Sequence, residues 1–205
     1  MKRALFVLLS VVLSAGAALA QPDAPAAPKQ EVATFAGGCF WCTEADFDKV
    51  PGVISTTSGF TGGTVANPSY QQVVSGTTGH TEAVEIVFDP AKVTYRQLLE
   101  VFWRNHDPLA KDRQFCDRGT MYRPGIFFHN EQQRALAEAS KKQVQSRFAP
   151  RVVQTEITMA GAFYKAEDYH QNFHEKNPVR YKLYRFNCGR EQRLEELWGK
   201  TEKSS

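Results

Sequence analysis

Residues 31–47 read EVATFAGGCFWCTEADF and contain a strand pattern, a glycine turn and a helix pattern in succession. Residues 31–36 are typical of a short strand, which Gly37 and Gly38 end. The aromatic and acidic residues that follow indicate a helix, which the PG pair at 51–52 stops. This order places Cys39 at or near the N-terminus of the helix.

Strand and helix patterns continue to interleave along the chain. We expect strands over 81–90, 122–130 and 151–160, and helices over 94–108, 130–148, 166–178 and 189–199. The Gly-, Thr- and Ser-rich residues 53–80 are expected to be mostly loop with short strands. A regular βαβ rhythm and a GxGxxG loop are both missing, which disfavours a dinucleotide-binding fold. The predicted class is α/β (α+β): a compact two-layer sandwich with a mixed central sheet, a ferredoxin-like plait, long loops and an irregular C-terminal segment.

The first 30 residues are expected to precede the catalytic domain. A basic head, a short apolar run and the small residues at 18–20 are typical of a secretory signal peptide over 1–20. Residues 21–30 are Pro/Ala-rich and predict a flexible tether, and 31–205 form a single domain. The formal net charge of +3 indicates neither nucleic acid nor, after signal cleavage, a membrane as partner. The expected location is outside the cytoplasm, in the periplasm.

Cys39 has the setting of a reactive thiol. A helix N-terminus favours the thiolate and lowers the pKa below the ordinary value of about 8.5. The two glycines leave the sulfur open, and Phe40 and Trp41 can form apolar walls beside it. A structural disulfide is the alternative, because cysteines of exported proteins commonly pair. A redox CxxC pair with Cys42 is a further alternative.

Glu82 falls by period two on the same strand face as Val84, Ile86 and Phe88. A carboxyl group on an apolar face loses hydration, so its pKa rises toward a proton-donating form. Alternatively, the strand begins at residue 83 and Glu82 is solvated at its end.

Further polar candidates lie in loops. Tyr70 stands in a Gly/Asn/Ser-rich stretch, and Asp117 and Tyr122 flank a glycine turn. His170 and His174 have the i,i+4 spacing of a helical zinc pair. A third ligand is not evident, and the glutamate of that motif is replaced, so we expect no metal.

The segments GGCFWC, GHTEAVEIVFDP, DRGTMYR, AEDYHQNF and the NP pair at 177–178 resemble the methionine sulfoxide reductase A family. They occur in the family's order, and the resemblance covers about residues 33–198. It implies reduction of methionine-S-sulfoxide, free and in peptides and proteins, without a metal or organic cofactor. The implied roles are the nucleophile Cys39, the methyl-group pocket of Phe40 and Trp41, the acid Glu82, the oxygen-binding phenols Tyr70 and Tyr122, and the organising residue Asp117.

The resemblance also implies a sulfenic acid on Cys39, which a second cysteine resolves and a thioredoxin-type partner recycles. We expect Cys188 to be the resolving thiol, with Cys42 as the alternative and Cys116 without an assigned role. The protein is expected to act as a monomer on oxidised proteins and peptides.

Two other functions stay open. An exported CxxC thiol-disulfide oxidoreductase would need Cys42 but not Glu82. A secreted binding module would be stapled by Cys39–Cys42 and Cys116–Cys188 and would have no turnover.

Overall fold

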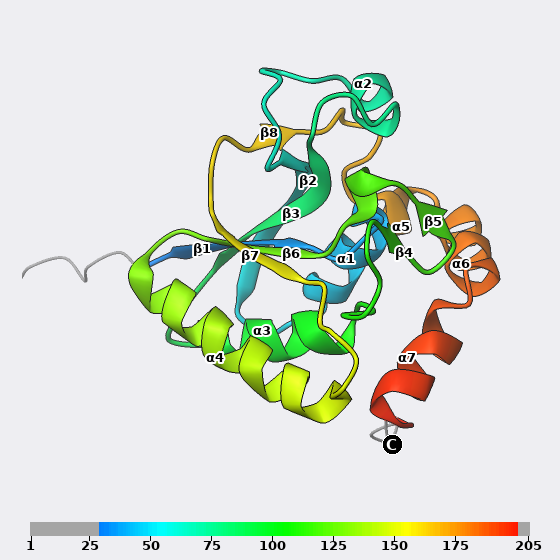
Figure 1. Ribbon diagram of the computed structural model, residues 1–205. Helices are drawn as coiled ribbons and strands as arrows, with labels where there is room; N and C mark the ends of the chain where they lie inside the picture. Colours follow the sequence, from blue (N-terminus) through cyan, green and yellow to red (C-terminus); the bar gives the residue numbers. More distant parts are fainter. Residues whose placement is uncertain (1–28, 201–205) are drawn as a thin grey trace, which may run out of the picture.

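A six-stranded sheet lies at the centre of the computed structural model, which describes residues 29–200 (Figure 1). Neighbouring strands run antiparallel except β6 and β7, which are parallel, so the predicted mixed sheet is confirmed. In their order across the sheet, the strands are β7 (Glu156–Met159), β6 (Gly125–Phe128), β1 (Glu31–Ala36), β3 (Thr81–Phe88), β2 (Val53–Thr61) and β8 (Tyr164–Lys165).

The four inner strands and two crossover helices form the ferredoxin-like plait. Helix α1 (Phe40–Phe47) connects β1 to β2, and α3 (Tyr95–Arg104) connects β3 to β6. Both helices pack against Phe35 in β1. Its ring centroid lies 5.3 Å from that of Phe47 in α1 and 4.9 Å from that of Phe102 in α3. This core between sheet and helices confirms the predicted two-layer sandwich.

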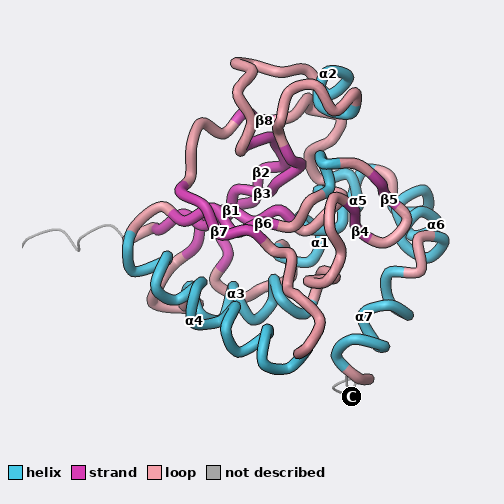
Figure 2. The backbone as a smooth tube through the Cα atoms, in the orientation of Figure 1, coloured by secondary structure: helices cyan, strands magenta, loops and turns pink. Residues whose placement is uncertain are grey.

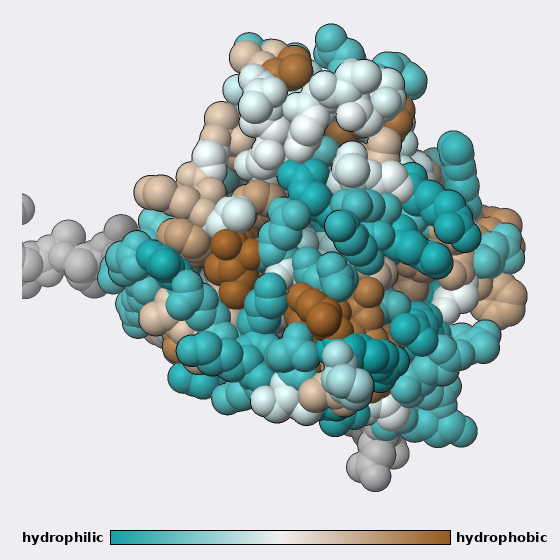
Figure 3. Space-filling view, viewed as in Figure 1, coloured by the Kyte–Doolittle hydropathy of each residue, from teal (hydrophilic) through white to brown (hydrophobic). Residues whose placement is uncertain are grey.

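Helix α4 (Glu131–Phe148) connects β6 to the parallel strand β7 and packs beside α3 (Figures 1 and 2). Side-chain caps start both helices close to the predicted positions. Thr94 and Gln97 form a capping box at the start of α3, and the Asn130 side chain accepts a hydrogen bond from the Gln133 N–H at 2.9 Å. Hydrophilic side chains cover much of α4 and of the C-terminal helix in Figure 3.

The prediction that residues 53–80 are mostly loop is wrong for its first part. Strand β2 has nine residues and pairs with β3 along its whole length, with a bulge near Ile54. Its Ser- and Thr-rich first half is half-buried or exposed, and the segment lacks the apolar alternation that marks a strand. Pairing with β3 decides its structure instead. A short helix, α2 (Tyr70–Val74), follows in the same region.

The C-terminal segment contains more helix than predicted. The helix expected over 166–178 is reduced to α5 (Phe173–Lys176), because Asn172 before it adopts a left-handed backbone with φ of 53°. Two longer helices follow: α6 (Pro178–Asn187), which was not predicted, and α7 (Arg190–Trp198), which confirms the helix expected over 189–199. A small hairpin of β4 (Arg113–Gln114) and β5 (Asp117–Arg118) lies beside α6 and leads into the 3-10 helix η1 (Thr120–Tyr122) (Figures 1 and 2).

The predicted signal peptide, residues 21–28 of the tether and residues 201–205 lie outside the described residues. Between residues 29 and 200, no helix has the length and apolar composition needed to cross a bilayer.

Candidate active site

The turn between β1 and α1 places Cys39 at the N-cap of the helix, as the sequence predicts. The Cys39 carbonyl accepts hydrogen bonds from the Cys42 N–H at 3.1 Å and the Thr43 N–H at 3.3 Å. Gly38 has a φ of 89°, and a Cβ atom there would lie 2.4 Å from Cβ of Gln114. The turn therefore requires glycine both for its backbone angle and for its close approach to the 113–114 strand.

The environment of the Cys39 sulfur differs from the expected open thiolate. The side chain is only 7% exposed. Burial raises the pKa of Cys39, and the charges of Cys42, Glu82 and Asp117 act in the same direction. The expected depression is wrong for the site without substrate, because lost hydration outweighs the helix terminus. A hydrogen bond from Cys39 lowers the pKa of Cys42, with a contribution from Arg190.

Glu82 is buried beside this turn and does not lie at a solvated strand end. It belongs to β3, opposite Phe60 of β2, and is 1% exposed. Its Oε2 accepts a hydrogen bond from the Phe40 N–H at 2.9 Å, which holds the carboxyl group next to Cys39. Burial raises the pKa of Glu82 to about 8 despite this bond. The carboxyl group is therefore protonated at neutral pH and can donate its proton.

Tyr70 and Tyr122 join the same cluster from α2 and η1. Burial raises the pKa of both phenols, and the charge of Glu82 adds to the rise in each case. The Tyr70 ring lies 6.4 Å from the Phe40 ring. Among the described residues, neither hydroxyl has a hydrogen-bond partner, so both can donate to a bound ligand.

Phe40 and Trp41 form an aromatic wall with Phe173, which the sequence did not identify as a site residue, and with the polar candidate His170. The Trp41 ring stacks on Phe173 at 3.8 Å, and its Nε1 donates to His170 Nδ1 at 3.0 Å. The His170 ring also lies 4.9 Å from Phe40 and 4.4 Å from Tyr70. His170 thus fixes the orientation of the Trp41 ring. His174 points elsewhere, with its Nε2 3.6 Å from Asp48 Oδ2. The two histidines do not form the zinc pair that their spacing resembles.

Asp117 reaches the site through Tyr184, which the sequence analysis missed. The Tyr184 hydroxyl donates to Asp117 Oδ2 at 2.5 Å, and its ring lies edge-on to Trp41 at 5.8 Å. Burial raises the pKa of Tyr184, and the charges of Cys39 and Asp117 act in the same direction. Tyr181 and Tyr184 both pack toward α1. Their spacing of three residues, which places two side chains on one helix face, was the sequence signal that could have identified Tyr184.

The four cysteines divide into two pairs with different states. Cys116 and Cys188 form a disulfide with a Cα–Cα distance of 4.8 Å, while Cys39 and Cys42 are free thiols. The Cys39–Cys42 staple of the binding-module hypothesis is therefore wrong. The disulfide is adjacent to Asp117 in sequence and is more exposed than the buried thiols. An oxidised pair beside free thiols fits a redox-active arrangement.

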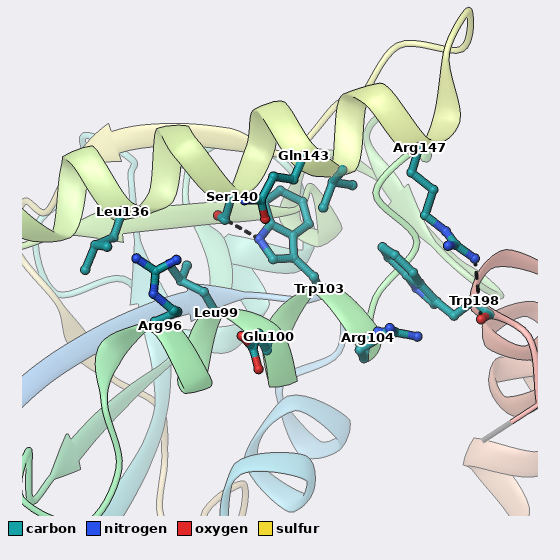
Figure 4. Close-up of a pocket in the computed structure, with 11 residues that line it drawn as sticks. Arg96, Leu99, Glu100, Trp103, Arg104, Leu136, Ser140, Gln143, Arg147 and Trp198 are labelled. Carbon is teal, nitrogen blue, oxygen red and sulfur yellow. Dashed lines mark hydrogen bonds between the residues drawn. The ribbon is translucent and has the colours of Figure 1, made fainter. Parts of the chain in front are cut away.

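A separate cavity of about 230 Å³ opens between α3, α4 and Trp198 (Figure 4). The polar side chains that line it make contacts within the fold. Trp103 Nε1 donates to Ser140 at 2.9 Å, and the guanidinium groups of Arg104 and Arg147 lie 5.0 and 5.2 Å from the Trp198 ring centroid. It contains none of the predicted site residues.

Comparisons with known proteins identify the family. A family model described as peptide methionine sulfoxide reductase matches residues 31–202. Peptide methionine sulfoxide reductase MsrA of Bacillus licheniformis is 51% identical over 175 residues, which cover 85% of this chain and 97% of that protein. MsrA 2 of Caulobacter vibrioides is 46% identical over 197 residues, or 96% and 99% of the two chains. The reduced form of Mxr1 from Saccharomyces cerevisiae has a TM-score of 0.70 at 32% identity and covers 76% of this chain and 89% of its own. The chain therefore belongs to the peptide methionine sulfoxide reductase family and is an oxidoreductase of the MsrA type.

Proposed function

We propose that this protein reduces the S epimer of methionine sulfoxide, both free and in peptides and proteins. The observation that carries the proposal is the buried Glu82 carboxyl group, which the Phe40 N–H holds next to Cys39 and whose pKa burial raises to about 8. A sulfoxide oxygen is a strong acceptor, and it leaves sulfur only as it gains protons. A neutral acid beside a thiol, with two free phenols, supplies that environment.

The methyl group of the substrate lies against Phe40 and Trp41, and its oxygen accepts hydrogen bonds from Glu82, Tyr70 and Tyr122. The Cys39 sulfur attacks the sulfoxide sulfur while Glu82 protonates the oxygen. The oxygen then passes to Cys39 as a sulfenic acid, and methionine leaves. The substrate sulfur gains two electrons, Cys39 loses two, and the Cys39 thiol proton replaces the proton that Glu82 gave. Each step uses side chains alone, without a metal or organic cofactor.

The sulfenic acid is resolved by a second cysteine, and the oxidation ends on the Cys116–Cys188 pair. The disulfide of that pair beside a reduced Cys39 corresponds to the state at the end of a turnover. A thioredoxin-type dithiol then reduces Cys116–Cys188 by exchange. The structure of reduced Mxr1 matches this chain at 32% sequence identity, and Mxr1 has also been solved in complex with Trx2. The proposal extends this kind of partner to the present protein.

The signal-like residues 1–20 support a periplasmic enzyme that repairs oxidised proteins after export. The reductant must then be a thioredoxin-like domain facing the same compartment.

The test compares the separate S and R epimers of a blocked methionine sulfoxide, with dithiothreitol as reductant. We expect turnover of the S epimer alone, abolished in Cys39→Ser and reduced about 10²- to 10⁴-fold in Glu82→Gln. The matched control Asp168→Asn changes an exposed carboxylate and should keep full activity. Equal turnover of both epimers, or full activity of Glu82→Gln, would contradict the proposal. Cys188→Ser should stay active with dithiothreitol and lose activity with thioredoxin.

A further inference from the structure

Cys116, Asp117 and Cys188 bring three side chains of metal-binding type to one place at the end of α6. Their two sulfur atoms and one carboxylate oxygen all lie within 4.8 Å of one another. Between residues 29 and 200, this is the sole cluster of three or more histidine, cysteine or acidic side chains whose ligand atoms converge in this way. The two cysteines are 72 residues apart in sequence, so the fold assembles the cluster.

The positions of these atoms suit a tetrahedral zinc ion once the disulfide is reduced. Zinc binds thiolate sulfur at about 2.3 Å and carboxylate oxygen at about 2.0–2.2 Å, so tetrahedral angles place the oxygen about 3.6 Å from a sulfur. Asp117 Oδ1 lies 3.7 Å from Cys116 Sγ. The same angles place two sulfurs about 3.8 Å apart. The Cα atoms of Cys116 and Cys188 are 4.8 Å apart, so rotation about the Cα–Cβ bonds of the reduced residues reaches this separation.

Tyr184 holds the carboxylate in the orientation that such a site needs. Its hydroxyl donates to Asp117 Oδ2, while Oδ1 is directed toward Cys116 Sγ. The disulfide-bonded Cys116 has no thiol proton, so Oδ1 receives no hydrogen bond from any of the described residues. A hydrogen bond to the second oxygen of a ligating carboxylate fixes its direction in metal sites. Oδ1 is therefore oriented and free to bind a cation.

Charge and exposure also suit a divalent cation. Two thiolates and one carboxylate carry one negative charge more than a zinc ion neutralises. Arg190 lies close enough to compensate this charge, because its guanidinium carbon is 4.5 Å from the ring centroid of Phe115, the residue before Cys116. Cys116 is exposed, and Asp117 and Cys188 are half-buried. An ion can therefore enter from solvent, and a water molecule can occupy the fourth position.

We propose that Cys116, Asp117 and Cys188 of the reduced protein bind one zinc ion, with water as the fourth ligand. The inference goes beyond the proposed function, because binding does not involve methionine sulfoxide. Each thiol gives up its proton as it binds the ion, and no electron is transferred. While zinc is bound, neither sulfur is free to form a disulfide. Conversely, the disulfide removes both sulfur ligands, so zinc and oxidation compete for the same two atoms.

The test titrates Zn²⁺ into the full chain against a chromophoric zinc chelator, in the absence of added thiols. Reduced wild type should bind one zinc ion more than oxidised wild type, in which Cys116 and Cys188 are joined while Cys39 and Cys42 stay free. This comparison needs no substitution, and it subtracts any zinc that the protein binds elsewhere. Equal binding by the two forms would overturn the inference.

Three variants of the reduced chain locate the ion. Cys116→Ser should lose it, and Asp117→Asn should bind it at least tenfold more weakly, because an amide oxygen carries no charge. Asp168→Asn changes an exposed carboxylate that pairs with Lys165, and as the matched control it should bind zinc like wild type. Undiminished binding by Cys116→Ser or Asp117→Asn would show that the ion lies at another place and would overturn the inference.

Zinc should also protect the two thiols from chemical modification. One equivalent of Zn²⁺ should slow the alkylation of Cys116 and Cys188 by iodoacetamide at least tenfold in reduced wild type, as measured by mass spectrometry of the peptides. A stronger chelator should restore the original rate. An unchanged rate with zinc present would contradict the inference. None of these measurements contains a sulfoxide, so their outcome is independent of whether the proposed reductase function holds.

Discussion

Glu82 occupies a strand position that packing alone would give to an apolar side chain. Its neighbours on the same face, Val84, Ile86 and Phe88, are fully buried. The sequence predicts this burial, and hence the direction of the pKa rise, from the period of two. It does not predict the hydrogen bond from Phe40, which joins groups 42 residues apart. The native chain thus holds a proton that the unfolded chain has released.

This proton gives a signature in the pH dependence of stability. Unfolded Glu82 ionises near its usual pKa of about 4.3, and the native group near about 8. Between these values the unfolded state binds fewer protons, so the free energy of unfolding falls as the pH rises. Glu82→Gln cannot ionise. Its free energy of unfolding relative to wild type should therefore increase by about 1.4 kcal/mol per pH unit in this window and level off above pH 8.

Urea unfolding of both proteins at several pH values from 4 to 9 measures this difference. A difference that stays constant across the window would show that Glu82 is ionised in the native state. The other titrating groups are common to both chains and cancel in the comparison.

The contacts that sequence reasoning missed join residues far apart along the chain. His170 and Trp41 are 129 residues apart, and Tyr184 and Asp117 are 67 apart. Residue spacing reports neighbours within one helix or strand, and it says nothing about which elements meet in space. Only the tertiary structure shows that α5 and α6 complete the aromatic wall begun by Trp41.

At the scale of elements, helices with explicit start signals were predictable and the strand without a pattern was not. Thr94 and Asn130 cap α3 and α4 where expected, since capping is a local hydrogen bond. Strand β2 was missed because its first half is Ser/Thr-rich and none of its side chains there is fully buried. Helix α6 was not predicted, because Pro178 was taken as the end of the helix expected over 166–178. Proline favours the first position of a helix, and Pro178 is the first residue of α6.

The attachment of α6 and α7 to α1 depends on one buried carboxylate. Asp46 pairs with Arg185 and with Arg190, and Arg190 is 2% exposed. Asp46→Ala leaves these guanidinium groups without their buried partner. We expect a loss of about 3–5 kcal/mol in the free energy of unfolding, measured by urea denaturation. Asp168→Ala, which breaks an exposed pair with Lys165, is the matched control and should leave the midpoint unchanged. Equal effects of the two changes would mean that the buried network does not hold the helices.

At the scale of the whole molecule, the order of strands and helices was sufficient to predict a two-layer α/β sandwich. The pairing order β6-β1-β3-β2 follows once the two crossovers lie on one face of the sheet. The C-terminal third was predicted less well, because it is held by the Asp46 ion pairs and the Cys116–Cys188 disulfide rather than by local patterns. The same ion pairs attach the segment that carries Cys188 to α1, at whose N-cap Cys39 lies.

The disulfide should also stabilise the whole chain, because it joins residues 72 positions apart. Closing a loop of that length removes conformational entropy from the unfolded state, and the expected gain is about 2–4 kcal/mol. Reduced wild type should therefore unfold at a lower urea concentration than oxidised wild type. The Cys116→Ser/Cys188→Ser variant should match the reduced protein with or without dithiothreitol. Identical midpoints for oxidised and reduced wild type would contradict the prediction. By linkage, folding favours formation of this disulfide by the same free energy, so in the proposed mechanism the Cys116–Cys188 pair draws the oxidation away from Cys39 and leaves that thiol reduced for the next substrate.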